Sequence, residues 1–158
     1  MLKKIPCLQE ELISLQEELN TLTNTERPAI IQAIASARAL GDLSENAEYI
    51  SAREKQSFIE GRIKELTTII SACEVVTPAS IHSTQVQFGA TVTLKNLDNE
   101  DVKTYKIVNE FSADPLKGRI SYKSPIAREL MGKKQCDVID VVTGRGEQSF
   151  EILSIEYV

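Results

Sequence analysis

Leucines recur along residues 8–22 at spacings of four and three residues, which is the pattern of an a/d stripe on one helix face. The members of this stripe are Leu8, Leu12, Leu15, Leu19 and Leu22. A second stripe of the same period consists of Tyr49, Ala52, Gln56, Ile59, Ile63, Leu66, Ile70 and Cys73. Two such segments joined by a short link predict an antiparallel α-helical coiled-coil hairpin over residues 1–76, with the return arm from residue 47 to 74.

The helical phase slips between the two stripes. Three apolar residues lie one position off the register that the first stripe sets: Ile30, Ile34 and Ala37. Pro28 has no backbone N–H and is tolerated only in the first turn of a helix. We therefore expect a break or kink between Asn24 and Pro28, followed by a new helix to about Leu40. On the return arm, Glu60 and Lys64 are spaced to form an i,i+4 ion pair.

The helical period ends near Thr77 and Pro78, and residues 77–85 are polar enough to be a linker. Short runs rich in β-branched residues follow at 90–95, 102–108, 119–122, 137–142 and 149–157. One helix is expected over residues 125–131, with Ser124 as N-cap, Pro125 in its first position and Gly132 just past its end. Residues 86–158 are thus predicted to form an α+β domain, an antiparallel sheet with one short helix.

Composition and cysteine spacing narrow the class of protein. Apolar residues make up 42% and charged residues 26%, the balance of a soluble globular chain. No apolar run approaches the roughly 20 residues that a membrane helix needs, so no membrane partner and a cytoplasmic location are expected. The three cysteines are widely spaced without a CxxC pair, which indicates neither a disulfide framework nor a zinc site.

The charge balance argues against a protein that grips nucleic acid along many phosphates. The net charge is −5, with 8 Lys/Arg against 12 Asp/Glu in residues 1–76 and 10 against 11 in residues 77–158. Neither half is basic. We therefore expect any RNA contact to be local and the main partner to be a protein.

The link between the two arms, residues 41–46, carries two acids, Asp42 and Glu45. Their spacing resembles a capping box, Ser44 is an alternative N-cap, and acids are favoured electrostatically at a helix N-terminus. The competing interpretation is a shared Mg²⁺, because this ion usually takes one or two protein carboxylates and keeps several waters. Two acids are too few to hold the ion, so a second protein would have to supply other ligands.

The run Gly41–Tyr49, continued by Ala52–Glu54 and Phe58–Ile63, resembles the signature of the bacterial Gre transcript-cleavage factors. Further matching segments in the second half are Phe88–Val92, Tyr105–Val108, Ser124–Ala127 and Phe150–Tyr157. The resemblance spans essentially the full chain, and the acidic stalk is closer to the GreA type than to the GreB type.

This resemblance implies an FKBP-like head and a coiled-coil stalk that enters the secondary channel of bacterial RNA polymerase. The family stimulates cleavage by the polymerase of the RNA 3′ end in backtracked complexes, so the chain itself would not be an enzyme. Asp42 and Glu45 would act at the polymerase active site and share its Mg²⁺, with no cofactor bound by the free protein. The head would dock on the polymerase through Ser124, Pro125, Ile126 and Ala127.

Four residues near the link are candidates to contact the channel or the nascent RNA in the polymerase complex. Arg38, Arg53 and Lys55 lie within a few turns of residues 41–46 and either meet RNA phosphates or remain solvated helix surface. Tyr49 occupies an a-position, so it either packs in the hairpin core or stacks on RNA.

Alternative functions remain at this point. A channel-binding inhibitor of the same architecture would occlude the polymerase without stimulating cleavage. A prolyl isomerase by fold analogy is disfavoured, because aromatics are 5% of the chain and Trp is absent. A self-sufficient nuclease is disfavoured because the single histidine, His82, lies in the linker.

Two loops of the second domain depart from the family pattern. Gly132-Lys133-Lys134-Gln135-Cys136-Asp137 stands where Gly-Lys-x-Val-Gly-Asp is common, and Thr143-Gly144-Arg145-Gly146 replaces a Thr-Pro-x-Gly turn. These departures put the conformation of both loops in question.

Overall fold

The structure is a computed structural model and describes residues 3–158. The described residues divide into two compact units: residues 3–5 with 12–73, and residues 6–11 with 74–158. Within the described range, none of the helices combines the length and apolar character needed to cross a bilayer.

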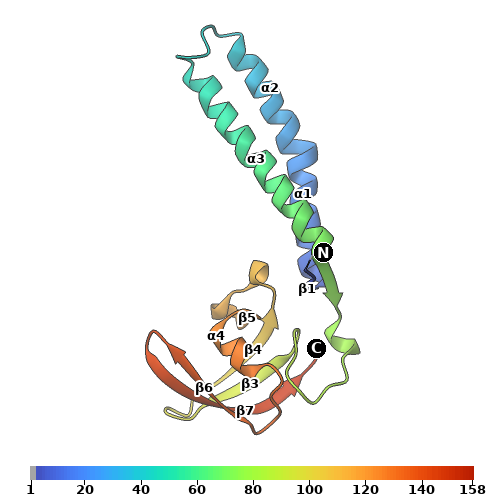
Figure 1. Cartoon of the computed structure of the whole chain (residues 1–158), viewed down its shortest axis with the longest axis vertical. Coiled ribbons are helices and arrows are strands. Elements are labelled where there is room, and N and C mark those ends of the chain that lie inside the picture. Colours follow the sequence, from blue (N-terminus) through green and yellow to red (C-terminus); the bar gives the residue numbers. More distant parts are fainter. Residues whose placement is uncertain (1–2) are drawn as a thin grey trace. The chain divides into compact units, whose positions relative to one another are not determined.

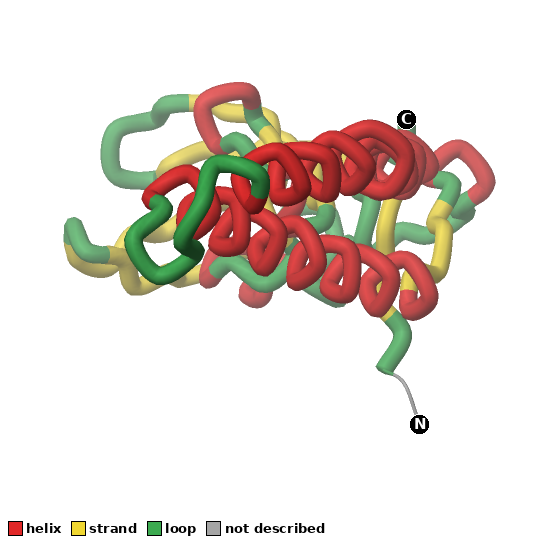
Figure 2. Tube along the Cα trace, turned by 90° about the horizontal axis from the view of Figure 1, so that it is seen from above, coloured by secondary structure: helices red, strands yellow, loops and turns green. Residues whose placement is uncertain are grey.

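The first unit is a helical hairpin, as predicted. Its outgoing arm consists of α1 (Gln9–Thr21), a π-helical turn (Leu22–Glu26) and α2 (Arg27–Arg38), and its return arm is α3 (Ala47–Ala72). The two arms lie side by side along their length (Figures 1 and 2). Ile30 and Ile34 of α2 pack against Ala52 and Ile59 of α3, and the flanking contacts come from Leu22, Tyr49 and Ile63. This part of the hairpin core therefore consists of the predicted stripe of the return arm, Leu22 of the first stripe and the apolar residues of α2 that follow the phase slip.

The phase slip has a different cause from the predicted break. The backbone stays helical through Thr21, Glu26 and Arg27, and the Arg27 N–H donates to the Leu22 carbonyl five residues earlier. A π turn is wider than an α turn and accommodates one extra residue, so the apolar stripe moves by one position without a break. Pro28 lies in the first turn of α2, where its missing N–H is tolerated.

Two short strands that the sequence did not indicate lie at the ends of the hairpin. β1 (Ile5–Leu8) pairs with β2 (Cys73–Val76) in a two-stranded sheet. The prediction that the return helix continues through residue 74 was therefore wrong, because α3 ends at Ala72. Over four residues, an apolar pattern does not distinguish a strand from the last turn of a helix.

Ion pairs cross between the arms of the hairpin. Arg27 meets Glu60 at 2.7 Å, and Arg62 meets Glu18 at 2.8 Å. The predicted Glu60–Lys64 pair was wrong, since the Glu60 carboxylate is taken by Arg27 of the opposite arm. These pairs are exposed or half-exposed, so each stabilises the hairpin by at most about 1 kcal/mol and mainly sets the register of the arms.

The second unit contains a five-stranded sheet in the order β5-β4-β3-β7-β6. Its strands are β3 (Thr91–Asn96), β4 (Val102–Val108), β5 (Arg119–Ser121), β6 (Val138–Thr143) and β7 (Gly146–Glu156). All five predicted runs are confirmed as strands. The sheet is not wholly antiparallel, however, because β4 and β5 pair in parallel.

The sheet curls around the short helix α4 (Pro125–Leu130) (Figure 1). Val92, Ile107 and Ile152 of the sheet are fully buried with Ala127 and Leu130 of α4. The predicted helix ends are confirmed: the Ser124 hydroxyl accepts from the Ala127 N–H at 3.3 Å, and Gly132 has the positive φ of 79° expected past a helix end.

A buried carboxylate joins distant segments of the second unit, to which the first turn of α1 belongs. Glu11 is 3% exposed and accepts from the backbone N–H groups of Leu8 at 2.8 Å and Asn109 at 2.9 Å, and from the Ser112 hydroxyl. The bond to Leu8 is the glutamate half of a capping box at the start of α1. The bonds from Asn109 and Ser112 go to the second carboxylate oxygen of Glu11, and together these hydrogen bonds offset the cost of burying the carboxylate.

One loop that departs from the family pattern contains a strained residue. Cys136 has φ 74°, a left-handed conformation that a side chain with a Cβ adopts at a cost of roughly 1–2 kcal/mol. Its side chain is exposed, and its N–H donates to the Ile152 carbonyl at 2.8 Å. The turn is therefore retained by backbone pairing although the residue common there, glycine, is absent.

Replacing Cys136 by glycine should stabilise the protein. Cys136→Gly removes the cost of the left-handed conformation. It also makes the unfolded chain more flexible, which costs about 0.5–1 kcal/mol, so the free energy of unfolding should rise by about 0.5–1 kcal/mol. Urea unfolding measures the change. Cys136→Ser keeps the Cβ and is the matched control, expected to stay near wild type; a glycine variant no more stable than the serine variant would contradict the strain argument.

Candidate functional site

Asn46 connects the two arms of the hairpin at its free end, in the loop of residues 39–46. Its side-chain oxygen accepts from the Tyr49 N–H at 3.1 Å, which makes Asn46 the N-cap of α3. Its side-chain N–H₂ group donates to the carbonyl of Ala37, in the last turn of α2, at 2.6 Å. One amide therefore satisfies a backbone donor of one arm and a backbone acceptor of the other.

The two acids of the loop are not helix caps. Asp42 accepts from the N–H of Ser44 at 3.0 Å and from the Ser44 hydroxyl at 2.9 Å, so its contacts stay inside the loop. Within residues 3–158, Glu45 makes neither a hydrogen bond nor an ion pair. The interpretations of Asp42 and Glu45 as a capping box, and of Ser44 as the N-cap, were therefore wrong.

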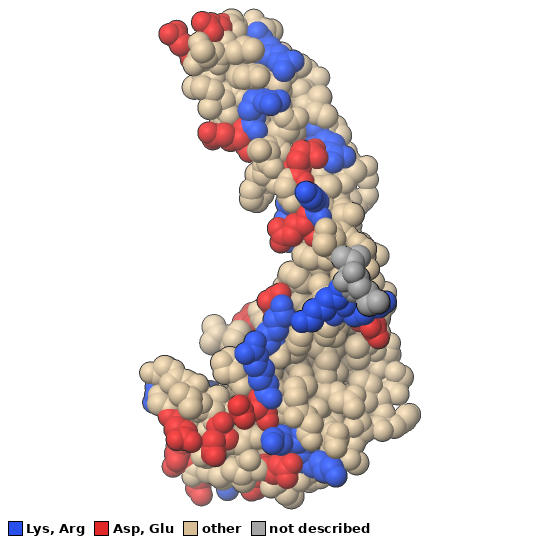
Figure 3. Space-filling model, in the orientation of Figure 1, with Lys and Arg blue, Asp and Glu red and all other residues tan. Residues whose placement is uncertain are grey.

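Both acids are exposed. The N–H of Ser44, and then its hydroxyl, lower the pKa of Asp42 below its ordinary value, so this carboxylate is ionised at neutral pH. Asp42 and Glu45 line a shallow open hollow together with Leu40, Ala47 and Glu48. Figure 3 shows acidic side chains gathered at this end of the hairpin.

The donor set of this tip fits part of a hard-cation shell. Carboxylate oxygens suit Mg²⁺, which commonly keeps several waters and takes one or two protein carboxylates. Within residues 3–158 no three acidic, histidine or cysteine side chains come together in a way that could hold a metal ion. The remaining ligands of any ion bound by Asp42 and Glu45 would have to come from outside the chain.

The residues behind the tip have both packing and surface roles. Tyr49 is half-buried against the hairpin core, as the packing interpretation predicted, and the Arg38 guanidinium lies 5.8 Å from its ring centroid. Arg53 donates to Gln56 at 3.2 Å, and Lys55 lies 4.0 Å from Glu26. All three basic side chains remain exposed, so contact with RNA or a channel stays a prediction.

The four residues predicted to dock the head differ in accessibility. Ser124 caps α4, Ile126 is half-buried against the head core, and Ala127 is fully buried. Pro125 is exposed. Pro125 and the outer part of Ile126 are thus the side chains that this segment offers to a partner.

Comparison with known proteins covers nearly the whole chain. Residues 5–75 match the family model for the N-terminal domain of transcription elongation factors, and residues 81–157 match that for the C-terminal domain of GreA/GreB. The chain is 52% identical to transcription elongation factor GreA of Paracoccus denitrificans, covering 99% of this chain and 100% of the relative. It is 53% identical to GreA of Ruegeria pomeroyi, covering 99% of both chains.

Solved structures are more distant. GreA factor homolog 1 of Thermus thermophilus aligns with a TM-score of 0.45 at 19% identity, covering 98% of this chain and 99% of that one. The elongation factor GreA/GreB of Nitrosomonas europaea aligns with a TM-score of 0.43 at 21% identity, covering 98% and 100%.

Loss of the Asn46 amide should loosen the end of the hairpin. Asn46→Ala removes the cap, worth about 0.5–2 kcal/mol, and the bond to Ala37, worth about 0.5–1.5 kcal/mol, so a total loss of about 1–3.5 kcal/mol is expected. Asn46→Ser retains capping ability without the long donor and should lose only the second part. Thermal unfolding followed by circular dichroism compares them, and equal stability of all three proteins would contradict the two-armed role.

Proposed function

We propose that this chain, which belongs to the GreA/GreB family of transcription elongation factors, binds bacterial RNA polymerase and stimulates cleavage of the RNA 3′ end in backtracked complexes. In this proposal the hairpin enters the secondary channel, and the loop of residues 39–46 reaches the polymerase active site. The head holds the factor on the polymerase outside the channel.

The observation that carries the proposal is that Asp42 and Glu45 are exposed acids that neither cap a helix nor, within residues 3–158, pair with a cation. Asn46 caps α3 and ties it to α2, so neither acid is needed to end a helix. Asp42 orders the loop through Ser44, but two exposed carboxylates at the end of a hairpin repel each other, and no cation within residues 3–158 pairs with them. Their placement is explained if a partner supplies the positive charge that they face.

Hydrolysis of an RNA phosphodiester bond requires an oriented water molecule and stabilisation of the negative charge on the attacking and leaving oxygens. A Mg²⁺ ion shared with the polymerase would supply that stabilisation when bound. Asp42 and Glu45 would each offer carboxylate oxygens to this ion or accept a hydrogen bond from the water. Ser44 holds the Asp42 carboxylate in place through two hydrogen bonds, so Asp42 is the better positioned of the two acids.

The chain alone would not hydrolyse RNA. Its tip contributes two carboxylates to the reaction, and the remaining ligands and the RNA register come from the polymerase. The factor is therefore an accessory to the polymerase active site and not a nuclease. The nascent RNA is a partner only within that complex.

Neutralising both tip acids should abolish stimulation without preventing binding. Asp42→Asn with Glu45→Gln keeps the size of both side chains but removes the anionic oxygens that Mg²⁺ prefers. We expect cleavage in a backtracked elongation complex, followed by the size of the RNA, to fall by about 100-fold or more, the scale of losing a preorganised electrostatic group. The double variant should still compete with wild type for the polymerase.

Glu48→Gln is the matched control, since Glu48 is another acid of the same hollow and should tolerate neutralisation. Near-wild-type cleavage with the double variant would show that Asp42 and Glu45 do not take part in cleavage. Occlusion of transcription by wild type without cleavage would favour the channel-binding inhibitor. Cleavage of free RNA by the purified chain, lost in the double variant, would overturn the accessory role.

The head should contribute polymerase affinity through Pro125. Pro125→Glu places an acid in the first position of α4, where it favours the helix electrostatically, so folding should be retained. The charge should oppose an apolar contact and weaken polymerase binding about tenfold, as for a disrupted interface residue. Glu129→Ala on the same helix is the control; unchanged affinity of Pro125→Glu would place the docking surface elsewhere on the head.

A further inference from the structure

One outward face of α3 carries an apolar surface that the hairpin does not use. Residues at spacings of four, four and three form this face: Ile50, Glu54, Phe58 and Gly61. Phe58 is 72% exposed and Ile50 is 45% exposed, although both belong to a helix whose opposite side is buried against α2. Aromatic side chains are seldom left so exposed in the middle of a helix without a partner.

Gly61 makes the same face unusual in a second way. It lies in the middle of the 26-residue helix α3, where glycine is less favourable than alanine. Its φ is not positive, and a Cβ built on it would meet no atom within 4 Å. Neither the backbone nor the packing of the hairpin therefore requires a glycine here. A missing side chain one turn from an exposed phenylalanine leaves a gap that another backbone can approach closely.

The position of this face identifies what surrounds it, and this step depends on the proposed function. Phe58 is 12 residues beyond the N-cap Asn46, or about 18 Å along the helix axis. If the tip reaches the polymerase active site, a face this close to the tip lies inside the secondary channel. Phe58 and Gly61 would then face the channel wall or RNA within the channel.

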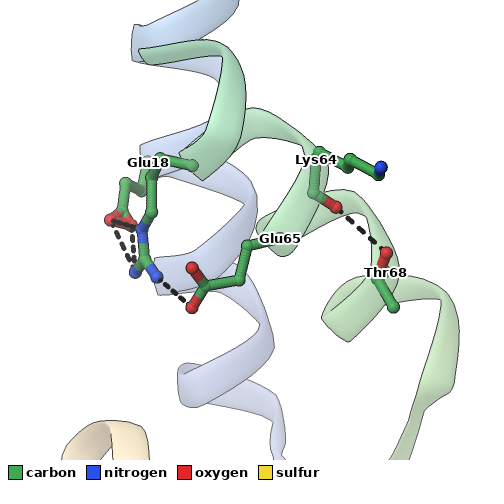
Figure 4. A network of polar contacts seen from close by, with 5 residues as sticks. Glu18, Lys64, Glu65 and Thr68 are labelled. Atoms are coloured by element: carbon green, nitrogen blue, oxygen red, sulfur yellow. Dashed lines mark hydrogen bonds and ion pairs between the residues drawn. The ribbon is translucent and has the colours of Figure 1, made fainter. Parts of the chain in front are cut away.

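Among the described residues, the one unpaired charge at three or four residues from Phe58 favours the protein wall over RNA. Lys55 and Arg62 also lie at this spacing, but Lys55 is 4.0 Å from Glu26, and Arg62 is paired with Glu18 and Glu65. Glu54 precedes Phe58 by one turn, and Glu65 follows Gly61 by one turn. Glu65 accepts from the Arg62 guanidinium at 2.8 Å, and the same guanidinium reaches Glu18 (Figure 4). Within residues 3–158, the Glu54 side chain makes neither a hydrogen bond nor an ion pair. An unpaired acid next to the ring repels phosphates and attracts a basic side chain.

We infer that the face formed by Ile50, Glu54, Phe58 and Gly61 is a contact surface for the protein wall of the polymerase channel. The wall presents an apolar side chain to Phe58, its backbone approaches over Gly61, and a Lys or Arg meets Glu54. The contact holds the hairpin at a fixed depth and rotation, so that Asp42 and Glu45 meet the active site.

Gly61→Ala and Phe58→Ser test this surface, because stability and function should change in different ways. Alanine is a better helix former, so Gly61→Ala should raise the melting temperature while the added methyl group obstructs the wall. Phe58→Ser should leave stability nearly unchanged, since the ring is exposed. Both should raise the factor concentration for half-maximal cleavage about tenfold, the scale of a truncated interface contact. Ile31→Ser, at an exposed apolar position of α2, is the control.

A photoreactive phenylalanine analogue at position 58 provides a second measurement that does not depend on cleavage. In the complex of the full chain with backtracked polymerase, it should crosslink to a polymerase subunit. A crosslink to RNA, or none, would overturn the assignment to the protein wall. The assignment would also be overturned if Gly61→Ala and Phe58→Ser reached half-maximal cleavage at the same factor concentration as wild type. If wild type crosslinks but does not stimulate cleavage, the proposed function fails while the contact surface stands.

Discussion

The function of the hairpin tip depends on one side chain that bonds to both arms. Asn46 accepts from Tyr49 and donates to Ala37, because its amide carries an acceptor oxygen and a donor N–H₂ on one planar group. A serine or aspartate would cap α3 equally well but would leave the last turn of α2 unanchored. Because this amide closes the hairpin, neither Asp42 nor Glu45 is needed as a helix cap, and the hydrogen bonds of Asp42 go to Ser44 within the loop.

Local patterns explain which parts of the fold were predictable. The apolar stripes and the β-branched runs record burial within a few residues, so the hairpin, five strands and the capped helix at Ser124 followed from the sequence. The π turn did not, because a one-residue slip is absorbed equally by a break or by a wider turn. The cap was also ambiguous: Asp42, Ser44 and Asn46 are all residue types that cap helices, and only the folded backbone, in which the Tyr49 N–H donates to Asn46, distinguishes them.

Contacts between distant segments lay beyond sequence reasoning. Glu11 has the spacing of a capping glutamate, but its bonds to Asn109 and Ser112 join residues about a hundred positions apart. The parallel pairing of β4 with β5 likewise depends on how the chain returns to the sheet edge. The Cys136 loop was predictable in part. The sequence showed that Cys136 departs from the family pattern, but only the structure shows that this residue has a positive φ.

The distribution of paired and unpaired charges separates the structural part of the hairpin from the part that faces a partner. Arg27 with Glu60 and Arg62 with Glu18 cross between the arms, where each charge neutralises another and fixes the register. Toward the tip such cross-arm pairing ends, and the acids of the loop lack a cation. A hairpin built only for its own stability would bury apolar surface and pair or omit these charges. The tip and the outer face of α3 instead expose acidic and apolar groups that the hairpin neither pairs nor buries, and the proposed contacts with a partner are argued from these groups.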